Sequence, residues 1–73
     1  MFYIVEHDMK VHQIIDVKGK GNKYGKAKLF DTEGDALYWL AKRKLGSLYG
    51  SSATTYPYYE VKEATPEQIA RWK

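Results

Sequence analysis

Two segments rich in β-branched and aromatic side chains lie close together at the start of the chain. They are residues 2–6 (FYIVE) and 11–17 (VHQIIDV), and the four residues HDMK separate them. This composition and spacing predict a β-hairpin. Residues 26–30 (KAKLF) then alternate, so that Ala27 and Leu29 share one face. We expect a third strand here, antiparallel to the second.

A run with helical spacing follows the third predicted strand. Its apolar stripe consists of Leu37, Leu40, Ala41, Leu45 and Leu48. Asp31 or Thr32 can cap the start of this helix. The carboxylates of Glu33 and Asp35 in the first turn offset the positive end of the helix dipole. Gly46 can supply the stop, and the small polar residues after it predict a loop.

The C-terminal part of the chain predicts a strand and a short helix. Residues 58–64 alternate, and Pro57 cannot donate a backbone hydrogen bond, so this strand starts after the proline or lies at a sheet edge. The sequence TPEQ that follows is typical of a helix start. The Thr65 hydroxyl can accept from the Gln68 N–H, and the Gln68 side chain can return the bond.

Together these elements predict a single α+β domain over residues 1–73 with the order β-β-β-α-β-α. We expect a four-stranded mixed sheet with the long helix packed on one face and a short C-terminal helix. A right-handed crossover through the long helix places the fourth strand parallel to an existing one. If it pairs with the first strand, the order across the sheet is fourth, first, second, third.

The composition narrows the class of protein. The chain has 73 residues and no Cys, so neither disulfides nor a thiolate zinc site can support its thin core. No apolar run approaches the length of about 18–20 residues that spans a bilayer. The N-terminus lacks the basic start and longer apolar stretch of a signal peptide. We therefore expect a cytoplasmic protein that does not enter a membrane.

Positive charge is concentrated in one glycine-rich segment. Five lysines fall within eleven residues that contain no acid: Lys18, Lys20, Lys23, Lys26 and Lys28. We predict that their ammonium groups neutralise phosphates on a partner, with Tyr24 stacking on a base or sugar. Lys42, Arg43 and Lys44 extend this surface if the fold brings them to the same side. The pattern is equally typical of a solvated hairpin tip whose lysines keep an edge strand from aggregating, and both interpretations stay open.

Tyrosines form a second candidate contact surface. Tyr49, Tyr56, Tyr58 and Tyr59 flank a stretch of small, flexible residues. Tyrosine beside such residues is the composition of many protein-contact surfaces. The alternative is that two of these rings pack beneath the helix and the others only flank it.

Known catalytic and cofactor patterns do not fit this chain. Gly19 and Gly21 begin a G-x-G-x-x-G pattern, but position 24 is Tyr and a predicted strand, not a helix, follows. His7 and His12 lie across the hairpin turn near acidic residues, yet no ligand spacing demands a metal. No base is placed by sequence beside a serine or threonine. We therefore predict a protein that is not an enzyme and has no cofactor and no metal site.

In its length, lack of Cys, sheet with one main helix and exposed charge, the chain resembles the very small α+β proteins that bacteriophages and other mobile elements encode to disable host machinery, anti-defence inhibitors among them. The resemblance covers general layout and no motif, and it implies a binder of inhibitor or modulator type. We expect its partner to be nucleic acid or a nucleic-acid-handling protein, contacted through the lysine-rich loop. The alternative is a protein–protein adaptor or inhibitor that uses the tyrosine-rich surface without nucleic acid. The oligomeric state stays open, a homodimer included.

Overall fold

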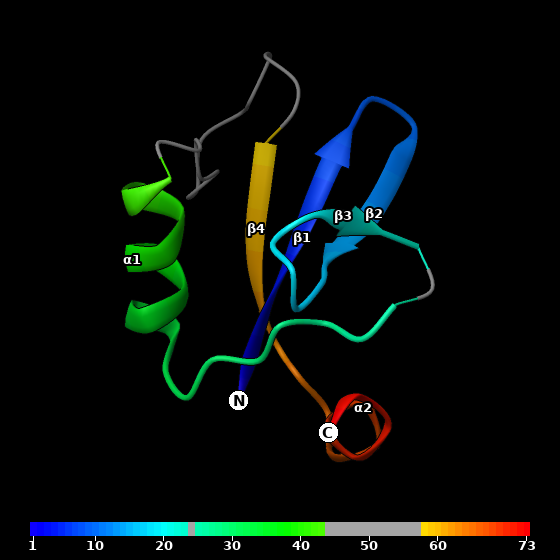
Figure 1. Cartoon of the computed structure of the whole chain (residues 1–73), viewed down its shortest axis with the longest axis vertical. Helices are drawn as coiled ribbons and strands as arrows, with labels where there is room; N and C mark the ends of the chain where they lie inside the picture. The colour runs from blue at the N-terminus through cyan, green and yellow to red at the C-terminus, as the bar shows by residue number, and fades with distance from the viewer. Residues whose placement is uncertain (24, 44–57) are drawn as a thin grey trace.

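The computed structural model describes residues 1–23, 25–43 and 58–73. The strands in these ranges are β1 (Phe2–Asp8), β2 (Val11–Ile15), β3 (Gly21–Asn22) and β4 (Tyr58–Glu63), and the helices are α1 (Glu33–Lys42) and α2 (Pro66–Trp72) (Figure 1). The predicted α+β class and the predicted order of elements are confirmed. Neither described helix is long and apolar enough to cross a membrane.

The four strands form one sheet in the order β3-β2-β1-β4. The pairing of the last strand with the first is as predicted, but the mixed sheet was wrong, because every neighbouring pair is antiparallel. Shortly before α1 begins, Phe30 pairs with Phe2 at the N-terminal end of β1. Helix α1 then runs along β1, and β4 begins at the opposite end, where Tyr58 pairs with His7 (Figure 1). From that end β4 can only run antiparallel to β1.

The third strand lies earlier in the chain than predicted. It is Gly21–Asn22, which pairs with the end of β2, whereas residues 26–30 make only isolated bridges, Ala27 to Asp16 and Phe30 to Phe2. The N–H of Lys28 donates to the carbonyl of Ile15 at 2.9 Å. Residues 27–30 therefore fill the gap where β1 and β2 separate and do not extend the edge of the sheet.

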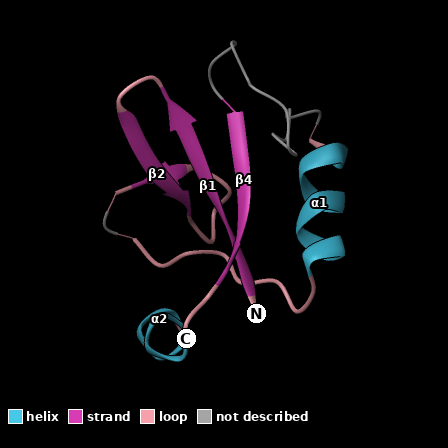
Figure 2. Ribbon diagram, turned by 180° about the vertical axis from the view of Figure 1, so that it is seen from behind, coloured by secondary structure: helices cyan, strands magenta, loops and turns pink. Residues whose placement is uncertain are grey.

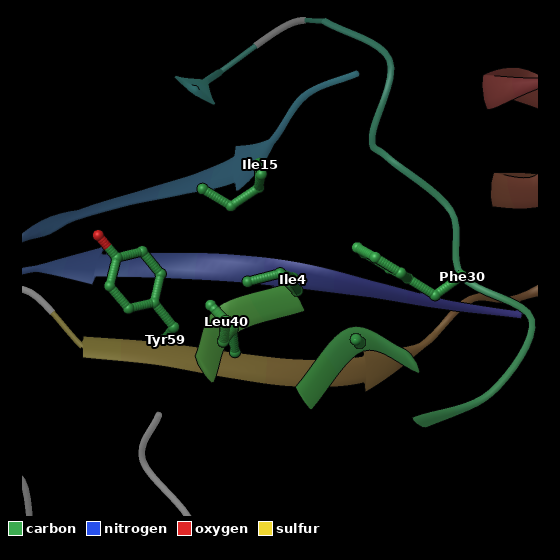
Figure 3. Packing of buried hydrophobic residues seen from close by; sticks show 6 residues of the cluster. Ile4, Ile15, Phe30, Leu40 and Tyr59 are labelled. Atoms are coloured by element: carbon green, nitrogen blue, oxygen red, sulfur yellow. The ribbon is translucent and has the colours of Figure 1, made fainter. Parts of the chain in front are cut away.

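One face of the sheet, here called the α1 face, carries the larger core. Because side chains alternate along a strand, Ile4 of β1 and Tyr59 of β4 point to the same side. Leu40 of α1 covers them, with Ile15 and Phe30 beside it (Figure 3). Ile4 and Leu40 are the largest fully buried side chains among the described residues. The α1 face therefore holds most of the tightly packed apolar surface of this part of the chain.

Helix α1 starts as predicted but turns a different stripe toward the sheet. The Thr32 hydroxyl accepts from the Asp35 N–H at 3.1 Å, so Thr32 is the cap. The buried residues of α1 are Ala36 and Leu40, while Ala41, which the sequence places in the apolar stripe, is exposed. The helix ends at Lys42, with Arg43 as its C-cap. The predicted continuation of the stripe through Leu45 and Leu48 to the loop after Gly46 lies outside the described residues.

The opposite face, here called the α2 face, has a smaller core at one end of the sheet. It contains Tyr3, Ala27 and Ala64, with Trp72 of α2 packed against them. The rings of Tyr3 and Trp72 are 5.0 Å apart between centroids. Helix α2 sits at the same end of the sheet as the N-terminus (Figure 2). Neither of the two described helices therefore covers the hairpin end of this face.

Candidate functional site

A compact turn follows β2 and organises the first lysines of the basic segment. The Asp16 carboxylate accepts from the backbone N–H groups of Lys18 and Lys20 at 2.9 and 3.1 Å. Its second oxygen accepts from the Asn22 amide at 3.4 Å. These contacts lower the pKa of the Asp16 carboxyl, with the Lys20 N–H as the largest cause. The glycine-rich sequence favours a turn or an open loop, and the structure has a turn here that the Asp16 carboxylate holds in shape.

Gly19 brings this turn against the last turn of α1. Its φ of +83° lies in the left-handed region, which glycine adopts without steric cost. A Cβ atom on Gly19 would lie 3.3 Å from Nη1 of Arg43 and 3.3 Å from Cζ2 of Trp39. The backbone between Lys18 and Lys20 therefore lies beside the Arg43 side chain.

An aromatic pair supports the cations at this junction. The Arg43 guanidinium lies over the Trp39 ring at 4.5 Å from its centroid. Trp39 in turn meets Phe30 edge to face at 6.1 Å, and the ammonium of Lys28 is 5.8 Å from the Phe30 centroid. We call the group Lys18, Lys20, Lys28 and Arg43 the basic rim. Its members come from the turn, from residues 27–30 and from α1, so the fold joins the lysine segment to the helix end.

The basic rim has no close salt bridge among the described residues, although the charge of Lys18 contributes to the lowered pKa of Asp16. In the described ranges, no Asp or Glu oxygen lies within 4.0 Å of a Lys or Arg side-chain nitrogen, and the one contact of a basic side chain with a carboxylate at this distance is that of His7 with Glu60. Tyr24 and residues 44–57 contain no Asp or Glu. The nearest carboxylate in the turn, that of Asp16, is occupied by backbone and amide donors. The Glu6 carboxylate, which lies near Gly21, accepts from the Tyr59 hydroxyl. The two carboxylates found near the turn are therefore both hydrogen-bonded to other groups.

The remaining predicted basic residues are less closely tied to this surface. Lys23 and Lys26 are exposed. The Lys42 ammonium lies 5.9 Å from the ring of Tyr38, a side chain that is 67% exposed on the outer side of α1. Tyr24 and Lys44 lie outside the described residues. The structure therefore brings part of the predicted basic set together and leaves the rest around its edge.

The predicted tyrosine surface is divided between core and sheet. Tyr59 is 6% exposed and packs in the α1 face, where its hydroxyl donates to Glu6 at 2.9 Å. Burial is the largest cause of a rise in the Tyr59 pKa to about 12, and the Glu6 carboxylate adds to it. Tyr58 stacks on His7, with ring centroids 4.7 Å apart. Tyr49 and Tyr56 lie outside the described residues. Tyr59 thus serves the core, whereas the alternative interpretation placed two of the four rings there.

The two histidines meet across the hairpin but do not assemble a metal site. Their rings are 4.5 Å apart in an edge-to-face arrangement, and Nε2 of His7 is 2.9 Å from Glu60. Glu6, the acid next to His7 in sequence, points to the opposite face and meets Tyr59. Residues 1–23, 25–43 and 58–73 contain no group of three or more His, Cys, Asp or Glu side chains that could hold a metal ion.

Sequence reasoning missed three residues that shape the basic rim. Asp16 has a recognisable signal, because an Asp whose oxygen can reach backbone N–H groups two residues on favours a turn. The pair Trp39 and Arg43 is spaced i, i+4 on a helix, where side chains meet. Gly19 had no such signal, since its close neighbour is a helix far along the chain.

Comparisons with family models, curated proteins and solved structures found no match to the chain.

Proposed function

We propose that this protein is a small non-enzymatic binder, of inhibitor or modulator type, that contacts nucleic acid through the basic rim. The observation that supports this most is the approach of Gly19, which lies between Lys18 and Lys20, to the Arg43 side chain, at a place where no described Asp or Glu oxygen is within 4.0 Å of a Lys or Arg side-chain nitrogen. Neutralising phosphates with Lys and Arg releases condensed counterions, and this release is the main source of sequence-independent affinity.

Nucleic acid is a better electrostatic partner for this surface than a protein that handles nucleic acid. Proteins that bind single strands or heteroduplexes line their channels with positive charge. A rim of four cations would be repelled by such a channel, whereas a phosphate backbone attracts it. A modulating effect would then follow from occupying the nucleic acid and thereby excluding other proteins from it.

Salt dependence tests this proposal directly. Four cations that each neutralise a phosphate of duplex DNA predict a slope of about −3.6 in a plot of log affinity against log salt. Affinity should then fall about 150-fold between about 50 and 200 mM salt. The measurement is fluorescence anisotropy of a labelled DNA duplex titrated with the protein. Replacing both Lys18 and Lys20 with Gln should make the slope shallower by about 1.8.

A matched pair of lysines serves as the control. Lys10, in the turn between β1 and β2, and Lys62, on β4 opposite Tyr3, are exposed and lie away from the rim. Replacing both with Gln removes the same charge and should leave the slope unchanged. An equal change of slope in the two double variants would show that only net charge matters. No binding at low salt to duplex or single-stranded DNA or RNA would refute the proposal.

A further inference from the structure

Arg43 differs from the lysines of the basic rim because its charged group is held in place. The guanidinium lies on the Trp39 ring at 4.5 Å, and Trp39 itself packs against the core of the α1 face. The i, i+4 spacing on α1 places the two side chains over one another. The Lys28 ammonium lies farther from its ring, 5.8 Å from the Phe30 centroid, and a lysine ammonium is a point charge at the end of a flexible stem. The described surface therefore combines mobile charges with one fixed cationic group.

The donors of that fixed group are available to a ligand. Arg43 is exposed, and its guanidinium makes no hydrogen bond or ion pair with another described residue. Stacking uses the flat face of a guanidinium and leaves the N–H groups along its edge free. These N–H groups have the spacing of two oxygens of a phosphate or carboxylate and can donate two parallel hydrogen bonds.

Gly19 of the turn also lies against the stacked side chains of Arg43 and Trp39. A Cβ atom on it would approach both Nη1 of Arg43 and Cζ2 of Trp39 to 3.3 Å, a separation at which one of them must shift. A side chain at position 19 would therefore push the stacked pair aside by a few tenths of an ångström and would also be strained by the positive φ. This contact places the backbone of Lys18 and Lys20 beside the Arg43 guanidinium.

We infer that Arg43, stacked on Trp39 and bounded by Gly19, is a preorganised fork that holds one phosphate diester of the nucleic acid by two parallel hydrogen bonds. This inference rests on the proposed function and adds to it a specific residue and a specific recognised group. The surrounding lysines supply attraction that depends on charge alone. The fork supplies a contact that also depends on the geometry of the donor.

Exchange of Arg43 for Lys separates charge from geometry. The R43K variant keeps the positive charge, so the salt slope for a fluorescein-labelled DNA duplex should stay as in the wild type. Affinity at every salt concentration should fall about tenfold, because the paired hydrogen bonds are lost. The chain supplies a matched control in its other arginine, Arg71, which is exposed on α2. The R71K variant should bind as the wild type does.

A second variant tests the contact of Gly19 with the Arg43 side chain. Gly19→Ala should weaken binding in the wild-type background and have little further effect in R43K, because both changes remove the same contact. Denaturant unfolding of each variant shows whether the domain is still folded. If G19A unfolds the chain, the comparison of R43K with R71K still decides the question, since both arginines are exposed.

The outcomes separate this inference from the proposed function. Equal binding by R43K and the wild type, with the slope still reduced by the Lys18 and Lys20 changes, would overturn the fork and leave the basic rim standing. A loss in R43K that comes only from a shallower slope would also overturn it. If the wild type binds no nucleic acid, the fork and the proposed function fall together.

Discussion

The two faces of the sheet are stabilised in different ways. On the α1 face, the helix contributes Ala36 and Leu40, which are 0% and 1% exposed and lie over fully buried Ile4. On the α2 face, the seven residues of α2 include no buried side chain. Helix α2 depends instead on its capping box and on the contact of Trp72 with Tyr3. Helix α1 is stabilised mainly by burial. Helix α2 is stabilised by local hydrogen bonds and by the partly buried side chains of Ile69 and Trp72, which pack against the smaller core.

This difference bears on the placement of the candidate site. Trp39 packs against the cluster of the α1 face and also carries Arg43, so the basic rim is attached to the better-packed half of the molecule. Rigid support of this kind is what a preorganised contact requires. Changes on the α2 face should therefore lower stability modestly without disturbing the rim, whereas changes under α1 should affect both.

The largest effect is expected at the centre of the α1 face. Leu40→Ala removes a side chain that is 1% exposed and should lower the free energy of unfolding by about 3 kcal/mol. That is a large share of the total for a domain of this size. Denaturant titration followed by circular dichroism measures it. Tyr38→Ala, on the outer side of the same helix, should cost less than about 0.5 kcal/mol.

A smaller effect is expected on the α2 face. Trp72→Ala removes a partly exposed ring whose main contact is Tyr3, and should cost about 1.5 kcal/mol. Trp39 is then the only tryptophan, so its fluorescence reports the α1 face alone and should keep its native spectrum. A loss as large as that of Leu40→Ala, or a changed Trp39 spectrum, would show that the two faces are not independent in the way described.

The parts of the fold set by neighbours in sequence were predictable. The capping box of α2 is a four-residue pattern, and both of its bonds form, from Gln68 N–H to Thr65 at 3.2 Å and from Thr65 N–H to Gln68 at 2.9 Å. The cap of α1 at Thr32 is equally local. The pairing of the last strand with the first was also expected, but the crossover rule used with it predicts a parallel pair, and the pair is antiparallel.

The direction of β4 could not be predicted because it depends on which end of β1 the chain lies beside just before α1 begins. The contact of Phe30 with Phe2 joins residues far apart in sequence, and no repeating pattern of side chains predicts it. The position of β3 depends likewise on the turn that Asp16 organises. In the candidate site, the charge of the lysines was evident from sequence, but the approach of Gly19 to Arg43 is another long-range contact.

The smallest effect concerns a polar contact on the α1 face, between Tyr59 and Glu6. The Tyr59 hydroxyl donates to Glu6, and Tyr59→Phe should cost about 1 kcal/mol near neutral pH, the usual value of one hydrogen bond. Burial and the carboxylate raise the folded-state pKa of Tyr59 from its ordinary value of 10.0 to about 12. The folded state thus retains this proton more tightly than the unfolded state does.

The resulting stability is fully present below about pH 10 and is lost as the pH rises through about 12. Wild type and Tyr59→Phe should therefore converge in free energy of unfolding over this window, because the variant has no phenol at this position to ionise. Unfolding titrations at several pH values from about 8 to 12 measure the difference between the two chains, which cancels the other tyrosines. A constant difference across the range would mean that Tyr59 ionises as easily in the folded chain as in the unfolded one, and that the α1 face is less closed at its polar end than its apolar centre is.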